Sequence, residues 1–203
     1  MKPILFNTEM VRAILDGRKT QTRRVIKSLD GLSFYRAEPS EDAYEALGKW
    51  DFFYGWLEGG VMFDACASVK APYSIGDILW VRETWNGDWC DHYIYKADGG
   101  SAVSAGYDKE PRWHPSIHMP RDAARIFLRV TDVRVERLQD IDDDGVVAEG
   151  LEIGAQFDEL WNRTLSKSDR AKFGWDANPW VWVIKFERCE RPDSITFIST
   201  MLS

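Results

Sequence analysis

The sequence predicts an α+β protein in which short helices flank a mostly antiparallel sheet, and three observations lead to that prediction. Segments of alternating apolar and polar residues recur along the chain, as in half-buried strands. Stretches with helical spacing are short, and two of them end at a glycine. The stretch 28–72 shows little of either pattern, and we expect two large insertions, at about 28–72 and 86–120. They would interrupt a single domain over residues 1–190, followed by a tail at 191–203.

The first predicted helix begins near Thr8, which has a side chain suited to an N-cap. Its apolar positions fall at helical spacing: Met10, Val11, Ile14 and Leu15. Gly17 follows where helices often take a left-handed residue. After the polar run 18–24, the apolar pair Val25–Ile26 indicates the start of a strand.

The middle of the chain predicts a hairpin, a turn and two strands. Glu58, Gly59 and Gly60 separate two aromatic-rich stretches in a way that is typical of a hairpin turn. Residues 73–77 form a predicted turn. Alternation then predicts strands over 78–85 and 92–97.

The last third of the chain predicts two further helices between two further strands. A helical turn over 121–125 precedes the longest strand signal, at 126–138, where an irregular apolar step favours a bulge. Asp142 is suited to cap a short helix that runs to Glu149 and ends at Gly150. An apolar stripe predicts a second helix over 157–165, and residues 179–187 predict the closing strand.

Composition and charge exclude several classes of protein. With 44% hydrophobic residues the chain can bury a core, and it contains no apolar run of the roughly 18 residues that a membrane span needs. We expect no membrane association and a cytoplasmic location. The net charge of -7 argues against a protein that coats nucleic acid non-specifically. Residues 1–27 nevertheless hold seven Lys or Arg against two acids, which suits a small anionic ligand or nucleotide.

The sequence predicts neither a disulfide framework nor a metal site. Its three cysteines lie far apart, and the three histidines have no ligand spacing with them. The run 140–145 matches the first half of a calcium-binding loop, but Leu151 stands where that loop needs a glutamate. We therefore interpret these acids as a helix N-terminus favoured by the helix dipole. No cofactor is predicted.

Lys19 and Thr22 are the first candidate catalytic residues. A threonine hydroxyl attacks a carbonyl only when a base takes its proton, and a lysine does this only when its amine is neutral. Burial or neighbouring positive charge lowers the pKa of such an amine. Three residues of separation on a flat strand would place the two side chains on opposite faces, so the pair requires a turn. Spacing alone favours an ordinary exposed lysine and an ordinary strand threonine.

A family resemblance changes that balance. The run GRKTQTRR after a helix, within KPILFNTEMVRAILDGRKTQTRRVIK, resembles the signature of ASCH domains of phage and prophage proteins. SIGDILWVRETW, VTDVRVERLQDIDDDGVVAEGL and PWVWVIKFERCE resemble later ASCH pieces in the same order. ASCH domains belong to the PUA-like superfamily, so the resemblance implies a mostly antiparallel PUA-like β-barrel with short flanking helices.

The resemblance also implies a chemistry. The small ASCH enzymes that hydrolyse N4-acetylcytidine use a lysine, a threonine and a glutamate. By the same resemblance Lys19 matches the proton acceptor, Thr22 the nucleophile and Glu149 the proton donor. The implied activity is hydrolysis of an amide on a modified nucleobase or nucleoside, without metal or cofactor. The alternative for Glu149 is a solvated carboxylate at a helix end.

Further residues are candidates for holding substrate or nucleic acid. Arg18, Arg23 and Arg24 could bind phosphate, and Trp85 could stack on a base. Glu83 could hold a base edge or pair with an arginine of the sheet. Two other functions stay open: a non-catalytic PUA-like module that binds RNA or a modified base, and a nuclease that uses the same basic cleft. Tryptophans in the insertions could stack on a base in either case: Trp50, Trp56, Trp89 and Trp113.

Overall fold

The computed structural model describes residues 1–29, 34–40, 49–58, 61–87, 93–99 and 112–192. The chain divides into two compact units, and each unit is assembled from separate segments of the chain. The first unit consists of residues 1–20, 77–129 and 186–203, and the second consists of 21–76 and 130–185. Predictions that involve Gly59, Gly60, Trp89, Cys90 and His92 lie outside the described residues.

The first unit combines α1 with short strands. β1 (Lys2–Leu5) pairs in parallel with β6 (Ile78–Arg82), and β6 pairs antiparallel with the start of β9 (Phe127–Arg137). β7 (Trp85–Asn86) pairs with β8 (Ile94–Tyr95). The predicted helical turn after residue 120 is confirmed as a 3-10 turn at Arg121–Ala123.

α1 (Thr8–Leu15) confirms the first predicted helix and corrects its cap. The N-cap is Asn7 rather than Thr8: the Asn7 Oδ1 accepts a hydrogen bond from the Met10 amide at 2.8 Å. Asparagine and threonine are both good N-caps, so composition alone did not separate neighbouring positions. Gly17 follows with φ of 76°, as predicted for the residue that ends this helix.

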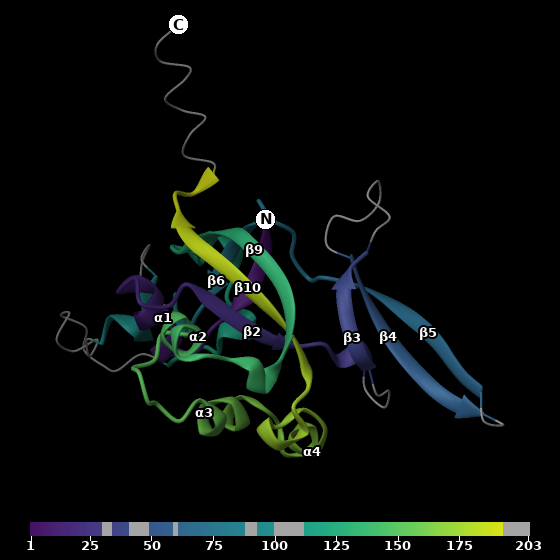
Figure 1. Ribbon diagram of the computed structural model, residues 1–203. Helices are drawn as coiled ribbons and strands as arrows, with labels where there is room; N and C mark the ends of the chain where they lie inside the picture. The colour runs from purple at the N-terminus through teal and green to yellow at the C-terminus, as the bar shows by residue number, and fades with distance from the viewer. Residues whose placement is uncertain (30–33, 41–48, 59–60, 88–92, 100–111, 193–203) are drawn as a thin grey trace, which may run out of the picture. The chain divides into compact units, whose positions relative to one another are not determined.

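The second unit contains two sets of strands. β2 (Gln21–Val25) pairs antiparallel with β10 (Trp180–Cys189), from Val25 opposite Val181 to Gln21 opposite Lys185. A separate sheet joins β3 (Phe34–Pro39), β4 (Lys49–Glu58) and β5 (Val61–Lys70) in that order (Figure 1). The predicted hairpin within 28–72 is thereby confirmed as the antiparallel pair β4–β5.

The described residues of the second unit also form three α-helices: α2 (Asp143–Ala148), α3 (Phe157–Thr164) and α4 (Lys167–Phe173). α2 begins as predicted, because the Asp142 carboxylate accepts from the Gly145 amide at 2.7 Å. Glu149 is its C-cap, followed by Gly150 with φ of 92°. α4 was not predicted.

The strand order confirms a mixed α+β fold but not a closed barrel. Five strands form one sheet in the order β1-β6-β9-β10-β2, so the predicted strands at 78–85, 126–138 and 179–187 share a sheet. The prediction that Val25–Ile26 starts a strand was wrong, because β2 begins within the polar run and ends at Val25. β9 and β10 each continue from one unit into the other. Among the described residues β1 and β2 have one partner strand each, so the sheet has two edges. Closure requires a partner on both sides of every strand, and the expectation of a closed barrel was therefore wrong.

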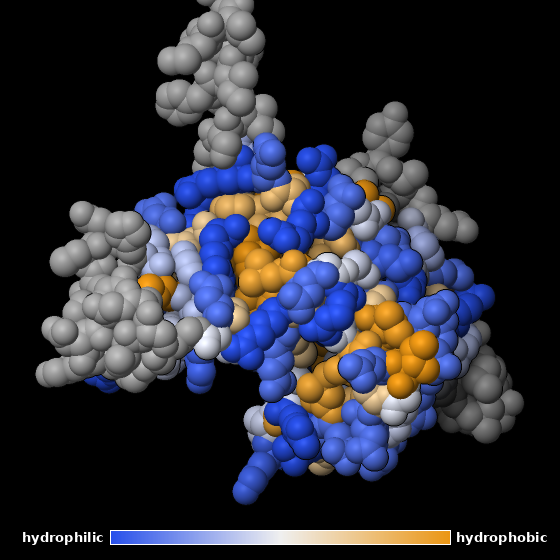
Figure 2. All heavy atoms as spheres, turned by 90° about the vertical axis from the view of Figure 1, so that its left-hand side faces the viewer, coloured by the Kyte–Doolittle hydropathy of each residue, from blue (hydrophilic) through white to orange (hydrophobic). Residues whose placement is uncertain are grey.

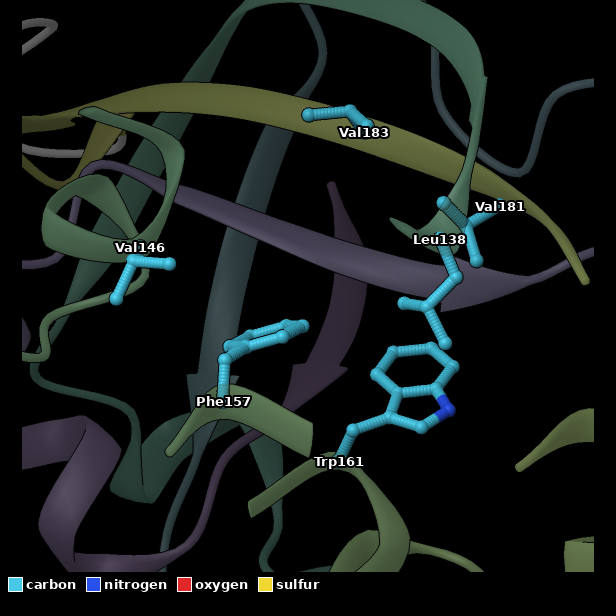
Figure 3. Packing of buried hydrophobic residues seen from close by; sticks show 6 residues of the cluster. All are labelled: Leu138, Val146, Phe157, Trp161, Val181 and Val183. Atoms are coloured by element: carbon cyan, nitrogen blue, oxygen red, sulfur yellow. The ribbon is translucent and has the colours of Figure 1, made fainter. Parts of the chain in front are cut away.

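Each unit has its own apolar cluster. In the second unit Val181 and Val183 lie two residues apart on β10 and therefore share a face. Figure 3 shows Phe157 and Trp161 of α3 with Leu138 and Val146 in this cluster. In the first unit a smaller cluster consists of Met119, Ala123, Ala124 and Phe127.

The described surface mixes polar and apolar side chains. On the face shown in Figure 2, hydrophobic side chains gather in areas bounded by hydrophilic ones. The more exposed large apolar residues include Ile75, Ile117 and Ile153, at 68%, 58% and 76% exposure. Singly exposed apolar side chains are normal, so they do not by themselves indicate a partner. Within the described part, no helix is long and apolar enough to span a membrane.

Candidate functional site

The turn after α1 buries Lys19. The Lys19 amide donates to the Ala13 carbonyl at 2.9 Å, which folds the chain back against the end of the helix. The side chain is only 2% exposed, and its Nζ lies 5.7 Å from the centre of the Phe6 ring. A buried lysine is uncommon, because taking an ammonium group out of water is costly. The sequence-based alternative of an ordinary exposed lysine is therefore wrong.

β2 presents its side chains alternately to two faces. Thr22 lies opposite Ile184 and Arg24 lies opposite Trp182 in the pairing with β10, so these residues share one face. Gln21 and Arg23 lie on the other face. Thr22 is 2% exposed. The motif thus divides its polar side chains between the two faces of an edge strand.

Arg23 is the centre of a buried ion-pair cluster in the second unit. Its Nη1 donates to Glu149 Oε1 at 3.2 Å, its Nε donates to Glu136 Oε1 at 2.9 Å, and its Nη2 also contacts Glu136. The Arg23 side chain is 1% exposed, whereas those of Glu149 and Glu136 are 5% and 16% exposed. The guanidinium also lies 5.9 Å from the centre of the Phe157 ring. Arg23 is therefore committed to internal partners rather than presented to a phosphate.

The same face of β2 holds α2 in place. Gln21 Nε2 donates to the Gly145 carbonyl at 3.0 Å. A Cβ at Gly145 would lie 3.1 Å from Arg23 Nη2 and 2.9 Å from Asp142 Oδ1, so glycine permits this close approach. Because Glu149 is the last residue of the α2 turn, Gln21 and Arg23 together fix its position relative to β2.

The ion-pair cluster extends along β9. Arg134 Nη2 lies 3.3 Å from Glu136 Oε2, and Arg134 Nη1 lies 3.5 Å from Asp132 Oδ2. The resulting series alternates in sign from Asp132 through Arg134, Glu136 and Arg23 to Glu149. It contains three carboxylates and two guanidiniums. Each of the two arginines therefore has at least two carboxylates within ion-pair distance.

Arg24 lines a hollow of about 350 Å³ on the other side of β2. Burial lowers the pKa of Arg24, while the charges of Glu149 and Tyr73 act in the opposite direction. The lining also contains Lys27, Lys70, Ser28, Tyr73 and Trp182. This size lies within the range of small-molecule pockets.

Glu83 and Trp85 belong to the first unit. The Glu83 side chain is 1% exposed, and Arg125 binds it with two hydrogen bonds, at 2.9 Å to Oε1 and 3.0 Å to Oε2. Burial raises the pKa of Glu83, and the hydrogen bonds from Arg125 oppose that shift. Of the two predicted roles for Glu83, the structure shows pairing with an arginine, although Arg125 lies just before β9 (Phe127–Arg137) rather than in the sheet. The Trp85 ring lies 5.2 Å from that of His114.

The structure brings some predicted site residues together. It joins Glu149 to Arg23 and places Thr22 on the Arg24 face, while Arg18 pairs with Asp16 on the surface. Lys19 belongs to the first unit and Thr22 and Glu149 to the second. Within the second unit, Thr22 lies on the face of β2 opposite to that of Arg23, which binds Glu149, so the convergence of the three residues stays a prediction. Sequence reasoning missed Gln21 and Glu136. Glu136 had only the signal of alternation with apolar residues, which polar residues on exposed strands also show. Gln21 had no such signal, because it stands within the polar run 18–24.

Comparisons with protein-family models, curated proteins and solved structures gave no match. Within the described residues, no three His, Cys, Asp or Glu side chains are grouped so that they could hold a metal ion. Asp142 instead caps α2, and Asp140 Oδ2 accepts from the Arg137 amide at 3.3 Å. The ASCH resemblance therefore stays a prediction that rests on the motif residues themselves.

Proposed function

We propose that this chain is an ASCH-type hydrolase that cleaves the amide of a modified nucleobase or nucleoside, with N4-acylcytidine as the type substrate. The observation that carries the proposal is the burial of Lys19, Thr22 and Glu149, at 2%, 2% and 6% exposure. Charged residues are rarely buried this deeply unless they are paired or functional. We further propose a cytoplasmic location, in keeping with three scattered cysteines.

The proposed reaction begins with attack by Thr22. Its hydroxyl oxygen forms a bond to the acyl carbon while Lys19 takes the hydroxyl proton. The carbon–nitrogen bond then breaks as Glu149 gives a proton to the exocyclic amine of the base, which leaves an acyl ester on Thr22. Water hydrolyses that ester. Arg23 acts as a positioning residue, because it holds the carboxyl group of Glu149 against β2.

The test is hydrolysis of a panel of N4-acylcytidines by purified protein, followed as loss of the acyl group. Lys19→Ala and Lys19→Arg should each lower kcat by about 100-fold or more, since general base catalysis contributes that much and a guanidinium keeps its proton. Thr22→Ala should abolish turnover and leave ligand binding intact, whereas Thr22→Ser should keep part of the activity. Lys167→Arg, at an exposed position on α4, is the matched control.

Full activity of a folded Lys19→Arg variant would show that Lys19 is not the base. Folding of each variant is checked by near-ultraviolet circular dichroism.

A non-catalytic module that binds a nucleotide or RNA is the second candidate. The hollow beside Arg24 favours it, because cationic and aromatic side chains line a cavity that needs no catalytic group. The two functions differ in one measurement. A binding module retains N4-acetylcytidine unchanged, whereas the hydrolase releases acetate and cytidine from it.

A further inference from the structure

The hollow beside β2 has an electrostatic character opposite to that of the whole chain. The protein carries a net charge of -7. Yet the lining, as far as the structure describes the chain, includes three cations, Arg24, Lys27 and Lys70, and no acid. Lys27 has an exposed ion pair with Asp169 at 3.1 Å. A cationic lining on an acidic protein focuses a positive field at this place, which attracts anions.

The pairing of β4 with β5 adds a second sign of an anion. Lys49 lies directly opposite Lys70 in this pairing, at the end of the hairpin where Lys70 lines the hollow. Side chains that are directly opposite share one face, so Lys49 places a further positive charge beside that of Lys70.

The hollow also has groups that could contact the sugar or base of a larger anionic ligand. Tyr73 and Ser28 supply hydroxyl groups, while Trp182 and the neighbouring apolar residues supply a wall against which a sugar or a base can lie. Trp182 is itself held rigidly, because Phe52 and Trp50 pack edge-on against it at ring distances of 6.4 and 6.5 Å. An apolar and aromatic wall with a few polar groups is typical of small-molecule sites, and the cations of this lining suit a ligand that also carries a phosphate.

The position of Thr22 connects this hollow to the proposed chemistry. Thr22 and Arg24 lie on the same face of β2, two residues apart, and two residues of strand span about 7 Å. A ribose keeps a base and its 5′-phosphate separated by a gap of this order. Arg24 therefore lies where the phosphate of a nucleotide would fall if its base were presented to Thr22.

We propose that this hollow is a phosphate subsite, and that the protein takes its modified base as a nucleoside monophosphate in preference to the free nucleoside. The placement of the base rests on the proposed function, whereas the phosphate subsite rests on the hollow alone. The test is therefore a binding measurement that needs no turnover.

Isothermal titration at low salt compares four probes: cytidine, cytidine 5′-monophosphate, inorganic phosphate and an oligocytidine without terminal phosphate. The monophosphate should bind at least about tenfold more tightly than cytidine or inorganic phosphate, and this preference should shrink as salt rises. Lys70→Gln and Lys27→Gln should each lower its affinity about fivefold and change that of cytidine less than twofold. Lys167→Gln makes the same charge change at an exposed residue that does not line the hollow, and it should change neither affinity.

Each other result would overturn the inference. Equal affinity for cytidine and its monophosphate would remove the subsite, and equal affinity for inorganic phosphate would make it a site for free anions. A preference that survives Lys70→Gln and Lys27→Gln would place the phosphate elsewhere, and tightest binding of the oligocytidine would identify a polymer as the ligand. Absence of hydrolysis would contradict the proposed function and leave this subsite standing.

Discussion

The two units each contain a buried ion pair, but the most deeply buried partner is a carboxylate in one and a guanidinium in the other. In the first unit the carboxylate of Glu83 is 1% exposed, while its partner Arg125 is 28% exposed. In the second unit Arg23 is 1% exposed, and its partners Glu149 and Glu136 are 5% and 16% exposed. A buried carboxylate that loses its partner can take up a proton, whereas a guanidinium cannot lose one. The two units should therefore respond differently to loss of a partner, and pH should reveal the difference.

The largest effect is expected when Arg23 loses both carboxylates. The double variant Glu136→Gln with Glu149→Gln keeps the side-chain shapes and leaves a buried cation without a counter-charge. Breaking a buried pair in this way costs about 3–5 kcal/mol. We expect the free energy of unfolding to fall by that amount at both pH 5 and pH 8. The measurement is urea unfolding, monitored by tryptophan fluorescence. A loss below about 1 kcal/mol would mean that water reaches the Arg23 guanidinium.

The second prediction concerns Arg125→Met in the first unit. The folded chain holds the pKa of Glu83 above its ordinary value of 4.5, so the stability that Glu83 contributes falls as the pH rises above 4.5 toward the folded pKa. Removing Arg125 should raise that pKa further. We expect a loss of about 2 kcal/mol at pH 8 that becomes smaller by about 1 kcal/mol at pH 5, measured by urea unfolding. Glu83→Gln should abolish this pH dependence. If Arg125→Met lowered the free energy of unfolding equally at both pH values, the two units would not differ in the way that we expect.

The smallest effect is expected at exposed pairs, which are alike in both units. Lys2 pairs with Asp77 at 2.7 Å in the first unit, and Lys27 pairs with Asp169 in the second. Exposed pairs contribute about 0–1 kcal/mol, because water and salt screen them. Lys2→Gln and Lys27→Gln should each shift the urea midpoint only slightly, and less at high salt. A large shift of the urea midpoint in either variant would show that exposed ion pairs also contribute strongly to stability. Burial would then not explain the difference between the two units.

Sequence reasoning succeeded where the signal was local. The cap at Asp142 and the glycine at Gly17 both depend on a few neighbouring residues, and the structure confirms both. The main strands were found because alternation extends over several residues. Weakly periodic α4 was missed, since its run KSDRAKF has few apolar positions.

The parts that were missed depend on contacts between distant segments. β1 and β6 pair in parallel although they lie more than seventy residues apart in the sequence, and the periodicity of a strand does not indicate which strand it pairs with. Arg23 was predicted to bind phosphate because it stands in a basic run, yet its partners Glu136 and Glu149 lie 113 and 126 residues away. Only the folded chain shows that one arginine of the run is internal while its neighbour Arg24 lines a hollow.

The interleaving of the two units has a consequence for the order of synthesis. The chain crosses from one unit to the other after residues 20, 76, 129 and 185. The second unit therefore has all of its strands only after residue 185 has been synthesised and has left the ribosome. The first unit is completed later, because it includes residues from 186 onward. Its early residue Thr20 receives a hydrogen bond from the Phe186 amide at 2.9 Å. Closing such long loops is slow, so we expect nascent chains to stay dependent on protection from aggregation until translation is almost past residue 186.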